Sequence, residues 1–173
     1  MEKEKVCCFT GHCPQGLSFG YDERDERCKA LKARLKTEII KLIKEHGVMT
    51  FISGMAMGVD MYAAEIVLEL KAYYPYITLE CAIPCESQAE KWSEPLRDRY
   101  FEIVEKCDKK TLLQTHYTTE CMQRRNEYMV NKSHYVLAVW DGTASGTGNT
   151  VRYAQEKGKT VINLNPEEMF SSR

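Results

Sequence analysis

The sequence predicts an α/β protein in which a mostly parallel β-sheet lies between two layers of helices. Short apolar runs without polar alternation, typical of strands that are buried on both faces, recur along the chain. Between them lie segments whose apolar residues are three and four positions apart, which is the spacing of a helix packed on one face. Strands that alternate with helices in this way favour parallel pairing.

Length and composition indicate a single globular domain over residues 1–173. The chain carries a formal net charge of −1, and 43% of its residues are hydrophobic, which suffices for one sizeable core. A pI of about 6.4 gives no basic field, which argues against nucleic acid as a partner. No targeting segment or membrane span is visible, so we expect a cytoplasmic protein without a membrane partner. The sequence leaves open whether the chain forms a homo-oligomer.

Six strands are expected, each a short apolar run bounded by turn residues. Three of them show no polar alternation, so they are expected in the interior of the sheet, and these are Val6–Thr10, Met49–Ser53 and Tyr135–Trp140. The other strands are expected over Ile77–Pro84, Thr111–Gln114 and Thr160–Leu164.

Five helices are expected between these strands, because apolar residues recur there at helical spacing. The first stops at Gly47, the fourth is capped by Thr119, and the fifth stops at Gly158. The helices are expected over Cys28–His46, Val59–Leu70, Gln88–Cys107, Glu120–Lys132 and Asn149–Lys157.

The chain is organised around a strand, a glycine-bearing turn and a helix over Phe51–Leu70. Glycines allow a close approach of backbone to a ligand, and the first N–H groups of a helix attract an anion. The alternative is that the glycines only permit a tight turn, because short loops between strand and helix often need them for geometry. The candidate ligand-binding residues of this turn are Ser53, Gly54, Met55, Gly58 and Asp60.

A second glycine-rich loop, DGTASGTG over Asp141–Gly148, precedes the last long helix. Its hydroxyl side chains, with those of the helix that follows, donate hydrogen bonds to phosphate or ribose oxygens without adding charge. The loops after the first, second and fifth strands converge at the carboxyl edge of a parallel sheet, where such sheets bind ligands. The further candidates are therefore Thr10, Gly11, His12, Asp141, Gly142, Ser145, Gly146, Thr147, Asn149 and Thr150.

Arg125 and Asn126 lie on the helix before the fifth strand. Arginine clamps a phosphate with two parallel hydrogen bonds, and we expect Arg125 and Gly146 to form one anion site. The alternative for this arginine is a solvated helix face. His12 lies in a converging loop, but the sequence shows no carboxylate that would orient it as a catalytic base.

Other ligand motifs are excluded by single residues. Gly158-Lys159-Thr160 ends like a P-loop, but Tyr153 occupies the position of the upstream glycine. Gly146-Thr147-Gly148 begins like a dinucleotide fingerprint, but Val151 stands where the third glycine belongs. The eight cysteines include no CxxC pair, so we expect buried free thiols, no metal site and no cofactor.

With these motifs the chain resembles the SLOG superfamily of Rossmann-like proteins, and within it the YpsA-like group of uncharacterised bacterial proteins. Ser53–Asp60 is similar to the SGxAxGxD motif of DprA/Smf DNA-processing proteins. The resemblance spans nearly the whole chain and implies a Rossmann-like three-layer sandwich. Arg125-Asn126, Ser133 and Ser145–Ala154 follow in the same order as matching residues of the DprA/Smf proteins. The segments similar to the YpsA-like group are Phe9–His12, Gln88 with Trp92, and Arg99-Tyr100.

The resemblance implies binding or sensing of a nucleotide or a nucleotide-derived small molecule, with no catalytic residue assigned. The superfamily includes LOG-type phosphoribohydrolases, whose motif is similar to GGxGTxxE, but Thr150 stands at the position of its Glu. A phosphoribohydrolase is therefore the alternative, with Asp60 or Asp141 as the substitute acid. A DprA-like single-stranded DNA binder is a further alternative, which the low pI disfavours.

Overall fold

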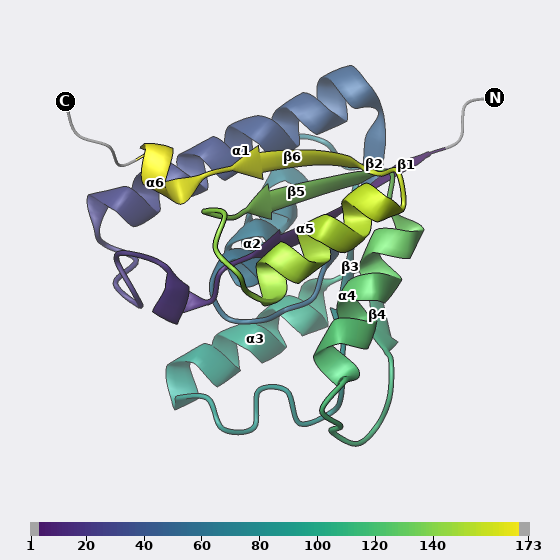
Figure 1. Cartoon of the computed structure of the whole chain (residues 1–173). Helices are drawn as coiled ribbons and strands as arrows, with labels where there is room; N and C mark the ends of the chain where they lie inside the picture. The colour runs from purple at the N-terminus through teal and green to yellow at the C-terminus, as the bar shows by residue number, and fades with distance from the viewer. Residues whose placement is uncertain (1–3, 170–173) are drawn as a thin grey trace.

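The computed structural model describes residues 4–169, and Figure 1 shows one sheet with helices on both of its faces. The strands are β1 (Lys5–Gly11), β2 (Val48–Ser53), β3 (Thr78–Ile83), β4 (Lys109–Leu112), β5 (Tyr135–Val139) and β6 (Thr160–Leu164). All neighbouring strands pair in parallel, in the order β4-β3-β2-β1-β5-β6. The predicted Rossmann-like fold class is confirmed, and β1, β2 and β5 lie in the interior of the sheet as expected.

The helices form two layers. On one face lie α1 (Glu26–His46), α2 (Val59–Leu70) and α3 (Glu94–Lys106), and on the other lie α4 (Cys121–Lys132) and α5 (Gly146–Glu156). Two short helices complete the described chain, the 3₁₀ helix η1 (Pro14–Gly16) and α6 (Pro166–Met169), which packs on α1. None of the helices in residues 4–169 is both long enough and apolar enough to cross a bilayer.

The sheet separates two hydrophobic cores because successive side chains of a strand point to opposite faces. Cys7 belongs to the larger core under α1, α2 and α3, and Cys8 to the smaller core under α4 and α5. In the larger core, Phe9 stacks on Phe51 with ring centroids 5.8 Å apart. Burial raises the pKa of the Cys8 thiol to about 12. Cys7 and Cys8 are therefore unreactive packing residues, as the sequence predicted.

Four predicted elements have boundaries that are wrong by two residues or more. The first helix begins at Glu26 rather than at Cys28, because the Asp25 side chain caps it. The helix expected from Gln88 begins at Glu94, because Pro95 fits only the first turn of a helix and the preceding residues form successive turns. The fourth strand, expected over Thr111–Gln114, is Lys109–Leu112. The last long helix begins at Gly146 rather than at Asn149, because the Ser145 side chain caps it.

The strand order reverses between β1 and β5. From β1 the chain adds β2, β3 and β4 on one side, and from β5 it adds β6 on the other. The two strands end in register, since Thr10 pairs with Ala138 and Gly11 with Val139. The loops that leave β1 and β5 therefore part at the switch point, the position where open α/β sheets bind ligands.

Candidate functional site

The loops at the switch point are joined by His12 and Asp141, which we call the switch-point pair. His12 Nε2 lies 3.1 Å from Asp141 Oδ1. The same carboxylate oxygen accepts hydrogen bonds from the N–H of Thr143 at 3.1 Å and from its hydroxyl at 2.6 Å. These bonds from Thr143 hold the pKa of Asp141 below its ordinary value, with a smaller contribution from His12. Asp141 is thus the carboxylate partner of His12 that could not be seen in the sequence.

The turn after β1 packs directly on the start of α2. The N–H of Val59 donates to the carbonyl of His12 at 3.4 Å. A Cβ on Gly11 would lie 2.6 Å from the Val59 side chain, and one on Gly58 would lie 2.7 Å from the His12 carbonyl oxygen. Gly58 also has φ +91, which other residues rarely adopt. Both glycines are therefore required by packing, and the N–H of Val59 at the start of α2 is already bonded within the protein.

Gly54 makes room for Arg125. A Cβ on Gly54 would lie 2.7 Å from Nε of Arg125, whose guanidinium donates to the Gly54 carbonyl. Its Nε donates to Asn126 Oδ1 at 2.8 Å, and Gln88 Nε2 donates to the same Gly54 carbonyl at 3.1 Å. Arg125 is only 4% exposed, so it does not lie on a solvated helix face. Its hydrogen bonds hold the loop after β2, and within residues 4–169 none of them reaches Gly146.

The loop from Ser53 to Asp60 satisfies its own polar groups. The Ser53 hydroxyl donates to the Asp60 carbonyl at 2.8 Å and accepts from the N–H of Met55 at 3.2 Å. The N–H of Ala56 donates to the Asp60 carboxylate at 3.3 Å. Burial raises the pKa of this carboxyl to about 6, against the opposing effect of Arg125. Met55 has φ 60, a strained conformation for a long side chain, and is fully buried.

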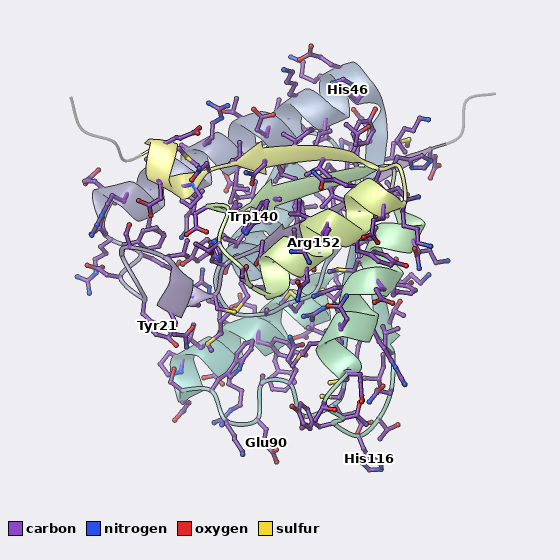
Figure 2. The ribbon with its side chains drawn as sticks, in the orientation of Figure 1. Tyr21, His46, Glu90, His116, Trp140 and Arg152 are labelled. Atoms are coloured by element: carbon purple, nitrogen blue, oxygen red, sulfur yellow. The ribbon has the colours of Figure 1, made fainter. Side chains whose placement is uncertain are left out.

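The start of α5 differs from these loops because it is open. Ser145 caps the helix by accepting from the N–H of Gly148 at 3.1 Å. No heavy atom lies within 4 Å of a Cβ built on Gly146 or on Gly142. Trp140, beside the start of α5 in Figure 2, fixes the loop by donating from Nε1 to the Thr143 carbonyl at 2.7 Å. A side chain at Gly146 would therefore enter open space, whereas Gly148 in the same turn packs against Trp140 and the Thr143 carbonyl.

The remaining candidate ligand-binding residues are mostly buried. Thr147 and Thr150 are buried on α5, and the Thr150 hydroxyl donates to the Gly146 carbonyl at 3.0 Å. Thr10 is buried at the end of β1, and Asn149 is exposed. No group of three or more His, Cys, Asp or Glu side chains in the described part of the chain is placed to hold a metal ion.

A cavity of about 520 Å³ lies next to the switch point, between the η1 turn, the start of α2 and the segment before α3. Sequence reasoning assigned it no role, since residues 15–26 looked like a polar excursion and Gln88–Ser93 like part of a helix. The only signal was the YpsA-like set of Gln88, Trp92 and Arg99-Tyr100, of which Trp92 and Arg99 line the cavity. Gln88 lies nearby and accepts from the Tyr100 hydroxyl at 3.4 Å.

Comparison with known proteins gives a family match and a fold match. The model of the YspA SLOG family matches residues 7–167. The chain is 33% identical over 129 residues to a UPF0398 protein of Brevibacillus brevis, covering 73% of this chain and 68% of that protein. It is 32% identical over 154 residues to the uncharacterised SPbeta prophage-derived protein YoqJ of Bacillus subtilis, covering 81% and 90%.

Two solved structures of DNA processing protein A share the fold. That of Helicobacter pylori, described for its single-stranded DNA binding mode, gives a TM-score of 0.62 at 19% identity and covers 93% of this chain. That of Streptococcus pneumoniae gives a TM-score of 0.59 at 16% identity and covers 94% of this chain. This chain spans 65% and 50% of those two chains. At such identities the likeness concerns the fold alone.

Because the Arg125 guanidinium packs against Gly54, we predict that Gly54→Ala destabilises the protein. The methyl group would displace the guanidinium from the Gly54 carbonyl, at a cost of about 1–3 kcal/mol in unfolding free energy measured with urea. Gly146→Ala is the matched control, because its methyl group meets no atom within 4 Å. Equal stability of the two variants would contradict the role given to Arg125.

Asp60 predicts a pH dependence of stability. Its pKa is about 6 in the folded chain against an ordinary 3.8, so the folded state holds the proton more tightly than the unfolded state. Stability should therefore fall as the pH rises from about 4 to about 6, by about 3 kcal/mol from this group, and then level off. Urea unfolding of the parent and of Asp60→Asn across this range isolates the effect, and parallel pH profiles would refute it.

Proposed function

Because the chain belongs to the YspA SLOG family, we propose that it binds a nucleotide or a nucleotide-derived small molecule at the switch point. The anionic group of the ligand lies at the start of α5, on the N–H groups of Gly146 and Thr147. The hydroxyl of Ser145 and the loop after β1 lie beside it. The switch-point pair fixes the two loops relative to each other, so that the site is formed before the ligand arrives.

One observation carries this proposal. Gly11, Gly54 and Gly58 are packed against Val59, Arg125 and the His12 turn, whereas the position of a Cβ on Gly146 is clear of protein atoms to 4 Å. The other clear positions, Gly20, Gly47, Gly142 and Gly158, have a positive φ that favours glycine, so Gly146 is the glycine that neither packing nor backbone conformation explains. A phosphate there gains hydrogen bonds from unpaired N–H groups and about 0.3–2 kcal/mol from the helix dipole.

Gly146→Val should weaken the binding of AMP or ADP-ribose about tenfold or more, because the side chain would occupy the space of the anion and remove its hydrogen bonds. Isothermal titration calorimetry measures the affinity, and thermal unfolding verifies the fold. Gly146→Ala adds only one methyl group to the same space and should weaken binding to a smaller degree. If the valine variant binds both ligands as tightly as the parent, the anion lies elsewhere.

The hydrolase alternative lacks an acid in the required place. The Thr150 hydroxyl is bonded within α5, and the Asn149 side chain accepts from Arg152 at 3.3 Å. Asp60 is buried in the loop after β2, and Asp141 is bonded to Thr143 and His12. We therefore expect no release of free base when the protein is incubated with AMP and related monophosphates. Chromatography of the products measures the free base. Turnover that disappears in Asp141→Asn would identify an enzyme and its acid.

Single-stranded DNA is a second candidate ligand, because the fold is similar to that of a protein described for its single-stranded DNA binding mode. The chain has 24 Lys and Arg residues against 25 Asp and Glu residues, so its net charge of −1 gives no overall attraction for a polyanion. A labelled oligothymidylate should therefore show no saturable change in anisotropy at about 0.15 M salt. Saturable binding that weakens with salt would favour the DNA-binding function instead.

A further inference from the structure

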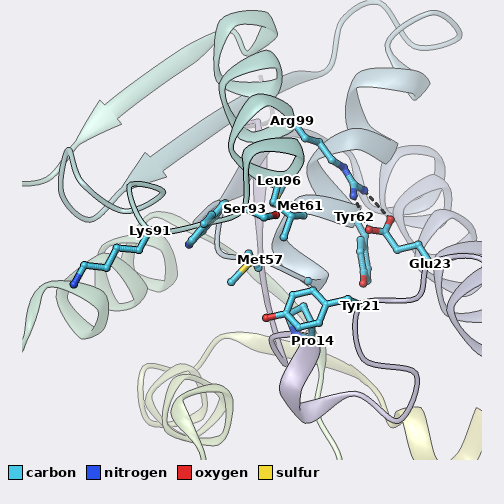
Figure 3. A pocket seen from close by; sticks show the side chains of 12 residues that line it. Pro14, Tyr21, Glu23, Met57, Met61, Tyr62, Lys91, Ser93, Leu96 and Arg99 are labelled. Atoms are coloured by element: carbon cyan, nitrogen blue, oxygen red, sulfur yellow. Dashed lines mark hydrogen bonds and ion pairs between the residues drawn. The ribbon is translucent and has the colours of Figure 1, made fainter.

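The cavity beside the switch point is built from three separate segments. Figure 3 shows Pro14 and Tyr21 at one side of the cavity, Leu96 with Ser93 at the opposite side, and Met57 and Met61 between them. The segments are the η1 turn with the residues that follow it, the first turns of α2, and the residues around the start of α3. A volume of about 520 Å³ falls within the range of small-molecule sites.

The lining of the cavity suits a planar ring. Tyr21, Tyr62 and Trp92 provide aromatic surface, and the two methionines provide polarisable thioethers. The walls are held in place by contacts outside the cavity. Trp92 meets the buried Tyr100 edge to face with centroids 5.3 Å apart, and the Tyr21 hydroxyl accepts from Gln15 at 2.8 Å. A flat aromatic group would be held between walls that need no rearrangement.

The charges at one end of the cavity neutralise each other. Arg99 forms paired hydrogen bonds with both Glu23 and Glu65, and Lys32 Nζ donates to Glu23 at 2.7 Å. Two cations thus face two carboxylates. Lys91 turns away from the other labelled side chains in Figure 3. The paired charges at this end leave Lys91, at the other end, as the lining cation without an ion pair among the described residues, and the aromatic and thioether surface between them favours an uncharged ring.

The cavity is joined to the start of α5 by a short path through the chain. Asp141, in the loop that leads to α5, contacts His12, and Pro14 of the cavity wall lies two residues further, at most about 7 Å along the backbone. Gly58, packed on the His12 carbonyl, also lines the cavity. His12 therefore contacts both the loop that leads to α5, through Asp141, and the cavity wall, through Gly58.

We propose that this cavity holds the aromatic base of the nucleotide whose phosphate lies at the start of α5, with the ribose crossing the turn at residues 12–14. This inference rests on the proposed function and adds to it that the ligand carries a base and that Tyr21 and Trp92 flank that base. Recognition of the base is separate from recognition of the phosphate, so each half of the ligand can be tested alone.

Calorimetric titration with AMP, adenosine and ribose 5-phosphate tests the proposal on the full chain. Tyr21→Ala removes a wall that is 52% exposed, and it should weaken AMP and adenosine about tenfold, the usual effect of losing one base–aromatic contact, while leaving ribose 5-phosphate unchanged. Leu96→Trp fills the cavity and should act in the same direction. Tyr21→Phe keeps the ring and should bind like the parent. Tyr73→Ala, at a tyrosine that is 73% exposed and does not line the cavity, is the matched control.

The outcomes separate the two claims. If AMP binds with the parent affinity in both Tyr21→Ala and Leu96→Trp, the base lies elsewhere and the cavity proposal is overturned, while the proposed function stands. If adenosine binds through Tyr21 and Gly146→Val leaves AMP unchanged, the cavity site stands and the phosphate site fails. If none of the three compounds binds at millimolar concentration, both claims fail.

Discussion

The guanidinium of Arg125, carried by α4 on one face of the sheet, donates a hydrogen bond to the carbonyl of Gly54 in the loop that leads to α2 on the other face. Gln88 donates to the same carbonyl from the segment before α3. Segments from both layers are thus fixed to one backbone group at the carboxyl edge of the sheet. Gly54 must be glycine for this contact to form, because a Cβ would collide with the arginine side chain. The first part of the loop after β2 is therefore fixed by internal hydrogen bonds, and its last residues, Met57 and Gly58, line the cavity.

This arrangement places a cation and a carboxyl group away from water. Burial lowers the pKa of Arg125, while the Asp60 carboxyl opposes that effect. Burial likewise raises the pKa of Asp60 to about 6, opposed by Arg125. Such groups are tolerated only when their hydrogen bonds are made. Within residues 4–169 every buried side-chain nitrogen and oxygen has a partner. The strained backbone of Met55 lies in the same loop, where these bonds hold it.

The fold could be predicted from the sequence because its signals are local. The apolar strands and the helical spacing between them are each carried by a few neighbouring residues. The start of α5 lies three residues before the predicted one. Gly146 and Gly148 are typical of a loop, but the Ser145 side chain caps the helix ahead of them. The helix expected from Gln88 rests on the apolar spacing of Leu96, Tyr100, Val104 and Cys107, and the segment before Pro95 carries no such spacing. The cavity that this segment borders was missed because the segment was assigned to that helix.

Contacts between distant parts of the chain could not be predicted. His12 and Asp141 are 129 positions apart and meet only because β1 and β5 are neighbours in the sheet. Arg125 was expected to share an anion site with Gly146, but its guanidinium donates to the carbonyl of Gly54, 71 positions earlier in the chain. The gathering of three loops at one edge follows from the parallel topology alone. The sequence does not tell which glycines of these loops are packed against other side chains and which have open space beside them.

The most direct measurement of the central claim is an amide ¹H–¹⁵N NMR titration of the protein with AMP. We predict that the amide signals of Gly146 and Thr147 move the most, because their N–H groups donate to the phosphate. The amides of Met55 and Ala56 should move little, since they already donate to Ser53 and Asp60. If the signals of the loop after β2 move and those of Gly146 and Thr147 do not, the phosphate is bound there and the open start of α5 is not the ligand site.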